Sequence, residues 1–180
     1  MANVRRVIPY LLVPTFTLIA MKLPTLLLLL IGLLFSGYTG ETYEYVQVIN
    51  WRYKPIIKTT LNGKKAYFLI DTGSDITVLH SKRAERFDFQ PLIASSQKLQ
   101  AMGFNGDRHT VYKATDVKLV IGTMPIKALY KTYDLSGVVR SIHNRVGIDV
   151  AGIIGSDVMK RYGFIIDYQK QTIAIKTKRK

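Results

Sequence analysis

Asp71 is the residue whose position most clearly indicates a role in chemistry, because an apolar run leads directly into it. Residues 66–70 read Ala-Tyr-Phe-Leu-Ile, which predicts a central strand that is buried on both faces. A carboxylate at the end of such a strand is unfavourable unless it is paired or used in chemistry. Thr72 can lock the following turn through its hydroxyl, and Gly73 lets another backbone approach closely. Taken alone, this Asp-Thr-Gly triplet is equally compatible with an ordinary turn.

A second apolar segment about eighty residues later changes that balance. It is Ile153-Ile154-Gly155, and a helix-compatible run over residues 156–162 follows it. Between the two segments, Gly103 and Gly106 surround Phe104-Asn105 in a predicted hairpin with a mobile tip. With these three features the chain resembles the retropepsin-like aspartic proteases, the family of retroviral proteases and their cellular and bacterial relatives. The resemblance covers roughly residues 55–175.

The resemblance implies an all-β fold, a closed acid-protease barrel with a flap hairpin and one short late helix. It also implies a role for each matching residue. Asp71 resembles the catalytic aspartate, and Thr72 and Gly73 resemble the residues that brace two catalytic loops across a dimer. The residues that it implies for substrate binding are Ser74, Asp75, Gly103, Phe104, Ile153 and Ile154, with Gly103–Gly106 as the flap tip. In retroviral members an Arg follows the second glycine and pairs with the acid that corresponds to Asp75. This chain has Ser156 at that position, so Arg161 or Arg140 would have to supply the ion pair.

The chemistry of such an enzyme predicts a homodimer. Peptide hydrolysis by this route needs two carboxylates that share one proton, with a water between them. Two carboxylates about 3 Å apart cannot both ionise, so their pKa values separate, as is known for pepsin. No second Asp-Thr-Gly exists in the sequence. The second carboxylate is therefore expected from a symmetry-related copy of the chain. The other predicted partner is the substrate, a peptide or protein.

Other kinds of function are less favoured. A binding module of the same fold that no longer performs catalysis remains the alternative. His80, His109 and His143 lack metal-ligand spacing and are interpreted as exposed or hydrogen-bonded surface residues. The formal net charge of +14 invites a nucleic-acid partner, but no stacking or groove-reading motif accompanies it. We therefore expect no metal, no cofactor and no nucleic acid.

The elements that must position Asp71 are mostly short strands. Strands are predicted over residues 43–50, 55–61, 66–70, 76–79, 117–121, 126–130 and 164–167. Asn62-Gly63 predicts a tight hairpin turn. A short polar helix or turn is expected near residues 81–87. The late helix should begin with Ser156 as its cap, carry Asp157 in its first turn, bury Met159 and Tyr162, and close at Gly163 in a left-handed conformation.

Residues 1–40 have a different composition from the rest. Their only charges are Arg5, Arg6 and Lys22, and residues 23–35 contain none. This pattern predicts an N-terminal hydrophobic helix that is either a signal peptide or a membrane anchor, with Met21 as an alternative start. The expected organisation is thus a membrane-anchored or secreted chain, with a retropepsin-like domain over residues 41–180 exported from the cytoplasm. The absence of cysteine leaves the redox compartment undecided.

Overall fold

A computed structural model describes residues 41–177 apart from residues 51, 94–97 and 103–107. The chain divides after Gly40 into two compact units, and all described residues belong to the second, Glu41–Lys180. The predictions for residues 1–40, and for Gly103 and Phe104 at the flap tip, lie outside the described residues. In the described part, no helix has the length and apolar character needed to cross a membrane.

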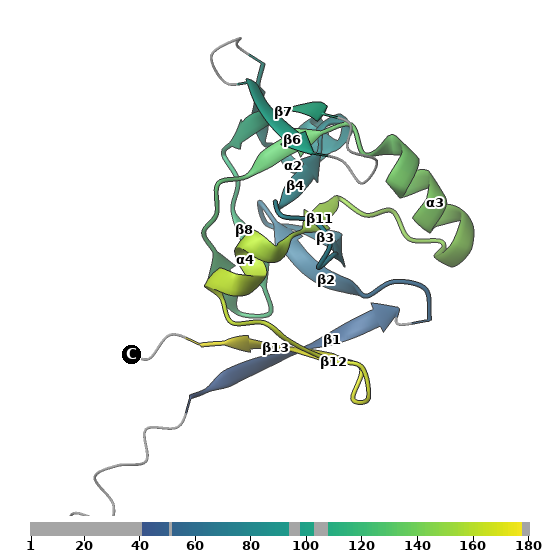
Figure 1. The fold of residues 1–180 in the computed structure, drawn as a ribbon, viewed down its shortest axis with the longest axis vertical. Coiled ribbons are helices and arrows are strands. Elements are labelled where there is room, and N and C mark those ends of the chain that lie inside the picture. Colours follow the sequence, from purple (N-terminus) through teal and green to yellow (C-terminus); the bar gives the residue numbers. More distant parts are fainter. Residues whose placement is uncertain (1–40, 51, 94–97, 103–107, 178–180) are drawn as a thin grey trace, which may run out of the picture. The chain divides into compact units, whose positions relative to one another are not determined.

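The described domain is built mainly of strands (Figure 1). The strands are β1 Tyr43–Asn50, β2 Ile56–Leu61, β3 Lys64–Ile70, β4 Val78–His80, β5 Gln90–Leu92, β6 Lys98–Met102, β7 Arg108–Thr115, β8 Leu119–Ile121, β9 Met124–Ile126, β10 Lys131–Tyr133, β11 Gly152–Ile154, β12 Ile165–Asp167 and β13 Thr172–Lys176. The helices are the 3-10 turn η1 Ser81–Arg83 and the α-helices α2 Ala84–Phe87, α3 Ser136–Val146 and α4 Ser156–Arg161.

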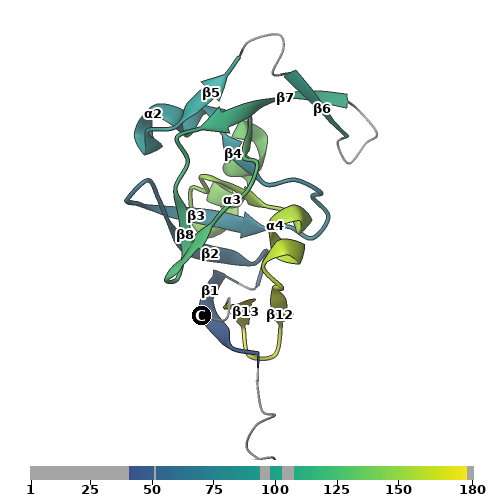
Figure 2. The ribbon, with the colours of Figure 1, turned by 90° about the vertical axis from the view of Figure 1, so that its left-hand side faces the viewer.

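The strands follow one path of neighbours, β12-β13-β1-β2-β3-β11-β4-β10-β7-β5. Strand β6 pairs with β7, and β8 pairs with β2 and β9. Figure 2 shows β12, β13 and β1 at one end of the domain and β5, β6 and β7 at the other. The mostly β architecture was predicted, whereas closure into a barrel stays a prediction.

Local sequence explains the hairpin between β2 and β3. Asn62 and Gly63 both have positive φ, at 49° and 78°. Two such residues form the turn type whose twist matches that of the flanking strands, and Asn-Gly is its preferred pair. The turn brings Leu61 opposite Lys64 and Ile56 opposite Leu69. This hairpin confirms the prediction made from the sequence, and it delivers β3 into the centre of the sheet.

The centre of the domain is a group of three strands in which β11 lies between β3 and β4. Strand β11 runs parallel to β3, with Ile153 opposite Leu69, and antiparallel to β4, with Ile153 opposite Val78. Because β3 and β11 are parallel, their carboxyl ends meet at the same edge. The residues that follow these ends, Asp71 and Gly155, are therefore brought together although they are far apart in the sequence.

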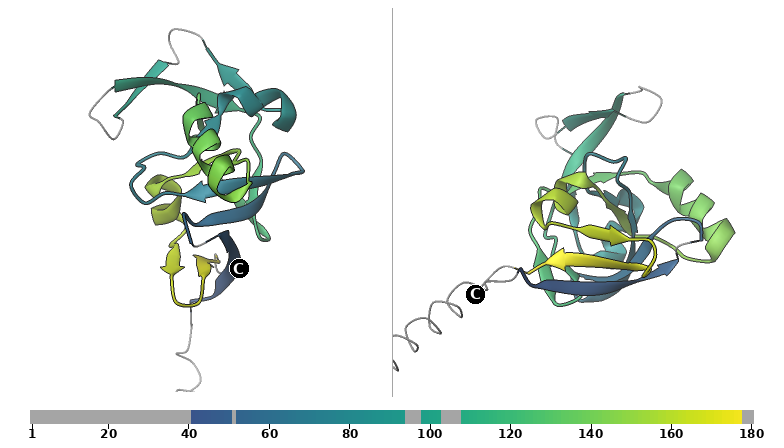
Figure 3. Two further views of the ribbon diagram at one scale, coloured as in Figure 1. Left: turned by 90° about the vertical axis from the view of Figure 1, so that its right-hand side faces the viewer. Right: turned by 60° about the horizontal axis from the view of Figure 1, so that its bottom comes forward.

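Successive side chains of these central strands point to opposite faces, and a helix covers each face (Figures 1 and 3). On the α4 side lies the larger cluster of buried residues, which contains Phe68, Ile70, Ile154, Val158 and Met159 among others. The α3 side has a smaller cluster: Ile56, Leu69, Val78, Leu135, Val139, Ile142, Val150 and Ile153. Met159 and Tyr162 lie in the core as predicted, each with 7% of its surface exposed.

The prediction of only one late helix is wrong, because α3 precedes α4. Its sequence, SGVVRSIHNRV, contains a glycine and several β-branched residues, which have a low intrinsic tendency to form a helix. Oδ1 of Asp134 accepts from the N–H of Ser136 at its N-terminus, and Gly147 ends it in a left-handed conformation. Val139 and Ile142, three residues apart, place their side chains on one face and bury them. Tertiary packing of this face therefore stabilises a helix whose interior residues favour it poorly.

Two finer predictions also fail. The strand expected over residues 126–130 does not form beyond Ile126, since β9 ends there and β10 begins only at Lys131. Ser156 is the first residue of α4 rather than its cap, which is Gly155. Gly163 does adopt the predicted left-handed conformation, with φ of 55°.

Candidate active site

Asp71 extends the pairing of β3 and β11 by one step beyond the end of β3. Its backbone N–H donates to the carbonyl of Ile154 at 3.1 Å. The chain then turns, with the N–H of Ser74 donating to the carbonyl of Asp71 at 3.1 Å. The N–H of Gly73 donates to Oδ1 of Asp71 at 3.1 Å, which orients the carboxylate. The half-buried carboxylate is thus held at the tip of a central strand.

The Asp71 loop, residues 71–77, is attached to the segment that begins α4. The N–H of Ser156 donates to the carbonyl of Ser74 at 2.8 Å. Gly155 lies so close to the loop that a Cβ added there would be 2.4 Å from the carbonyl oxygen of Ile76 and 2.8 Å from that of Ser74. Only glycine permits this approach of two backbones. The loop and the start of α4 therefore form one packed unit.

A buried hydrogen-bond network completes this attachment. Thr77 is fully buried, and its hydroxyl donates to Oδ1 of Asp157 at 2.7 Å. The same hydroxyl accepts from the N–H of Gly155 at 3.1 Å, while Oδ1 of Asp157 accepts from the N–H of Val158 at 2.8 Å. Asp157 occupies the first turn of α4 as predicted, but its bond to Thr77 was not foreseen. A lone polar residue between Ile76 and Val78 was the available signal.

The face of the carboxylate follows from strand alternation. Leu69, Ile153 and Val78 form a row across β3, β11 and β4, and this row packs under α3. Asp71 lies two residues beyond Leu69, so alternation is expected to direct its side chain to the same face. Ile154 points to the opposite face and is fully buried in the α4-side cluster.

The structure brings seven of the predicted site residues to one edge of the sheet, and they are Asp71, Thr72, Gly73, Ser74, Asp75, Ile153 and Ile154. Thr72, Gly73 and Asp75 are exposed, whereas Ile153 has only 8% of its surface exposed. Arg161, one of the suggested partners of Asp75, donates to the carbonyl of Lys127 at 2.9 Å. The roles of these residues in substrate binding stay predictions.

The histidines lie outside this loop. His80 is buried, which contradicts the interpretation of a surface residue, but it is hydrogen-bonded, since its Nδ1 accepts from the N–H of Leu135 at 3.1 Å. Burial lowers the pKa of His80, while the neighbouring carboxylate of Asp134 opposes this shift. His109 of β7 lies beside Tyr133 of β10, with Nδ1 3.2 Å from the phenol oxygen. In the described part of the chain, no group of three or more histidines or acids could hold a metal ion.

The segment of the chain that contains this loop is similar in sequence to a known protein family. Residues 57–161 match the family model described as "gag-polyprotein putative aspartyl protease". The matched range contains the Asp71 loop, β11 and α4, and it covers more than half of the chain. No curated protein matches the sequence.

Solved structures of low sequence identity are also similar. EIAV protease complexed with the inhibitor HBY-793 is 23% identical, with 63% of this chain and 92% of that chain covered and a TM-score of 0.41. A retropepsin-like aspartic protease from Rickettsia conorii is 18% identical, with coverage of 76% and 94% and a TM-score of 0.43. The retroviral protease-like domain of Ddi1 from Leishmania major is 17% identical, with coverage of 76% and 90% and a TM-score of 0.44.

Proposed function

Since this chain belongs to the gag-polyprotein aspartyl protease family, we propose that it is an aspartic endopeptidase whose active site forms from two copies of the Asp71 loop. The observation that carries this proposal is the position of Asp71. Its carboxylate stands at the end of a central strand, on a loop that Gly155 and Thr77 hold in place. A structure that fixes a lone half-buried carboxylate this firmly is suited to place it against a second one.

The dimer follows from the same chemistry. Each chain has one Asp-Thr-Gly sequence, while the reaction needs one ionised and one protonated carboxyl group around a water. A two-fold axis through the loop would provide both, because it places the same residue of each copy at the same site. Thr72 and Gly73 are exposed next to Asp71, which leaves this side of the loop accessible to a second copy.

In the proposed reaction the ionised Asp71 takes a proton from the water, and the resulting nucleophile attacks the peptide carbonyl. The protonated Asp71 of the other copy donates to the carbonyl oxygen, which gives a tetrahedral diol. The first Asp71 then passes the proton it took to the amide nitrogen, the C–N bond breaks to release the amine, and the other Asp71 takes back a proton from a hydroxyl as the carboxylic acid forms. The substrate would lie as an extended strand across the two copies, under the β6–β7 hairpin, with alternate side chains directed into the protein. Ile153 is proposed as an apolar contact for one of these side chains, while Gly103 and Phe104 would close over the peptide.

The first forty residues are proposed to direct or anchor the protease at a membrane, so that its catalytic domain acts outside the cytoplasm. This proposal rests on the uncharged apolar run of residues 23–35. Mass spectrometry of the protein from isolated membranes and from the medium would test it. Recovery of the full-length chain in the cytosolic fraction alone would contradict it.

Asp71→Asn tests the catalytic proposal. Asparagine keeps the shape of the side chain but cannot act as a base, so we expect peptide hydrolysis to fall by at least about a thousandfold. Cleavage of a peptide library at acidic pH and the mass of the particle in solution should both be measured. A loss of cleavage with an unchanged dimer supports the proposal.

Glu85→Gln is the control, because it removes an exposed carboxylate from α2, outside the Asp71 loop, and should leave hydrolysis unchanged. Hydrolysis that survives Asp71→Asn would remove Asp71 from the mechanism. A wild-type chain that binds peptides without cleaving them would instead favour the non-catalytic binding module.

A further inference from the structure

A second candidate site lies at the other end of β3 from Asp71. It is a cavity of about 350 Å³ between β3, α2 and the segment that connects α3 to β11. None of the residues that line it belongs to the Asp71 loop. The nearest in sequence is Tyr67, four residues before Asp71, which is about 13 Å along an extended strand. The volume falls at the lower end of the range for sites that bind small molecules.

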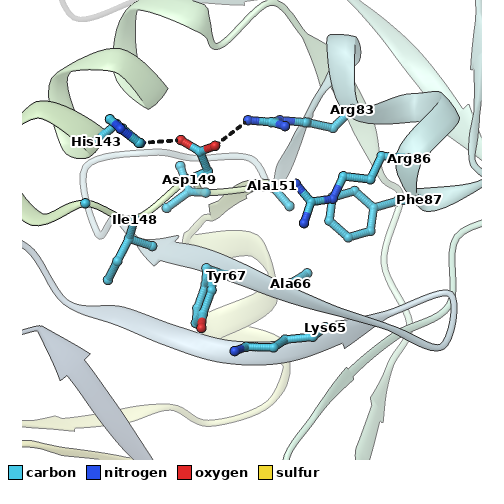
Figure 4. Close-up of a pocket in the computed structure, with 12 residues that line it drawn as sticks. Lys65, Ala66, Tyr67, Arg83, Arg86, Phe87, His143, Ile148, Asp149 and Ala151 are labelled. Atoms are coloured by element: carbon cyan, nitrogen blue, oxygen red, sulfur yellow. Dashed lines mark hydrogen bonds and ion pairs between the residues drawn. The ribbon is translucent and has the colours of Figure 1, made fainter.

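Positive charge surrounds this cavity. Figure 4 shows Arg83 and His143 along its upper edge, on either side of Asp149. Arg86 reaches in from α2, and Lys65 extends along the lower edge from β3. Three permanent cations and a histidine therefore face one carboxylate. These residues come from four separate segments, so the tertiary structure alone collects them.

The carboxylate of Asp149 is already occupied. Its Oδ2 accepts from Arg83 at 2.9 Å, and its Oδ1 lies 2.8 Å from Nδ1 of His143. Partial burial raises the pKa of Asp149, but the hydrogen bonds from His143 and Arg83 outweigh it and hold the pKa below its usual range. Asp149 therefore stays ionised and neutralises Arg83, while both of its oxygens already have a partner.

Lys65 and Arg86 have no such partner among the described residues, where no carboxylate lies within 4 Å of either cation. Each of them instead stands over an aromatic ring. Nζ of Lys65 is 5.1 Å from the ring centroid of Tyr67, and the guanidinium of Arg86 is 5.3 Å from that of Phe87. A cation–π contact positions a cation without neutralising its charge. The cavity thus combines two uncompensated cations with an apolar wall.

We propose that this cavity binds a small organic anion whose carboxylate or phosphate group lies between Arg86 and Lys65. Its apolar part would lie against the aromatic rings of Tyr67 and Phe87 and the side chain of Ile148, which also lines the cavity. The planar guanidinium of Arg86 can bind two oxygens of such a group at once, and the Lys65 ammonium adds a point charge. The site is independent of the proposed peptide hydrolysis.

Calorimetric titration of the full-length chain, in non-ionic detergent and at constant ionic strength, tests the proposal. The probes are inorganic phosphate, phenyl phosphate and benzoate. We expect saturable binding of phenyl phosphate or benzoate, and phenyl phosphate should bind about tenfold more tightly than inorganic phosphate because its ring contacts the apolar wall. The comparison of phenyl phosphate with benzoate shows which anionic group the site prefers.

Single charge removals then locate the site. Arg86→Gln and Lys65→Gln should each weaken the binding of phenyl phosphate about tenfold. Lys160→Gln removes the same charge from an exposed position on α4 and should change it less than about twofold. Equal effects of all three substitutions would mean that the overall charge of +14 attracts the probe, and would overturn the proposal.

Asp149→Asn provides a test in the opposite direction. It removes the negative charge that lines the same cavity and leaves the charge of Arg83 uncompensated, so binding of an anion between Arg86 and Lys65 should tighten several-fold. Unchanged or weaker binding in a folded Asp149→Asn protein would contradict the proposed position of the anion. The absence of saturable binding for all three probes would overturn the proposal as a whole.

Discussion

The two faces of the β3–β11–β4 strands are held in different ways. On the α4 side, backbone groups of Gly155 and Ser156 contact the Asp71 loop directly, and Thr77 and Asp157 join them through buried hydrogen bonds. On the α3 side, apolar side chains such as Val139 and Ile142 supply the packing. Apolar clusters pack both faces, and the larger one is on the α4 side, but among these contacts only those of the α4 side add hydrogen bonds that fix the Asp71 loop. This difference suggests that the α4 side sets the position of Asp71 and that the α3 side mainly contributes stability.

Gly155→Ala should have the largest effect of these substitutions, because it disrupts the packing of α4 against the Asp71 loop. The new Cβ would overlap the carbonyl oxygens of Ile76 and Ser74. These oxygens belong to the backbone and cannot move without moving the loop. We expect a loss of about 3 kcal/mol in the free energy of unfolding, together with displacement of the Asp71 loop. Urea denaturation and cleavage assays measure the two effects.

Gly137→Ala on α3 is the control for that substitution. A Cβ at Gly137 meets nothing within 4 Å, and alanine favours a helix, so stability should rise by up to about 1 kcal/mol. Equal losses from both substitutions would show that the two faces do not differ in their tolerance of a backbone change.

Ile142→Ala tests the α3 side. Ile142 has 1% of its surface exposed, and truncation would leave a cavity beneath the helix. We expect a loss of about 2 kcal/mol, at the low end for a buried isoleucine because an outer helix can settle into the space. Thermal and urea denaturation measure it, with the exposed Asn144→Ala as control. Loss of cleavage in a protein that remains folded would contradict the mainly stabilising role of α3.

Thr77→Val sharpens the role of the buried network. Valine has the same shape but leaves the N–H of Gly155 without its acceptor and Asp157 without one donor. We expect a loss of about 1.5 kcal/mol, with reduced cleavage because the loop is less firmly held. Thr77→Ser keeps the hydroxyl and should retain most of the activity. If valine and serine behave alike, the hydroxyl does not hold the loop.

The smallest expected effect is a pH dependence on the α3 side. Burial lowers the pKa of His80 in the folded protein, so below the ordinary histidine pKa of about 6.5 the unfolded chain binds a proton more readily than the folded one. The contribution of His80 to stability is therefore full above that pH and falls as the pH drops below it. His80→Asn can retain an acceptor for the N–H of Leu135 without titrating.

Urea denaturation at pH 7 and pH 5 tests this effect, and the stability of the His80→Asn variant should fall less between these values than that of the wild type. The exposed His143→Gln, at a histidine that contacts Asp149, is the comparison variant. A wild-type and a His80→Asn protein with the same pH dependence would contradict a buried neutral histidine.

The parts of the fold that followed from sequence are those with local signals. Asn62-Gly63 encodes its own turn, the apolar run into Asp71 encodes a buried strand, and Gly163 encodes the end of α4. The helix α3 had only Gly147 at its end as a comparable signal, because its interior residues favour a helix poorly and depend on a cluster that forms only when β3, β4 and β11 are assembled. The sequence also did not show that residues 127–130 connect β9 to β10 rather than form a strand.

Within the candidate site, Asp71-Thr72-Gly73 was predicted to be a catalytic motif only through a family resemblance that Ile153-Ile154-Gly155 supports, because the triplet alone is compatible with an ordinary turn. The reaction expected for such a motif needs two carboxyl groups, and the sequence contains one Asp-Thr-Gly, which led to the prediction of a homodimer. The tertiary structure decided that Ile153 and Ile154 point to opposite faces, that Thr77 joins Asp157, and that Lys65 and Arg86 line the same cavity. Contacts of this kind depend on strand pairing between residues distant in sequence, and spacing along the chain does not record them.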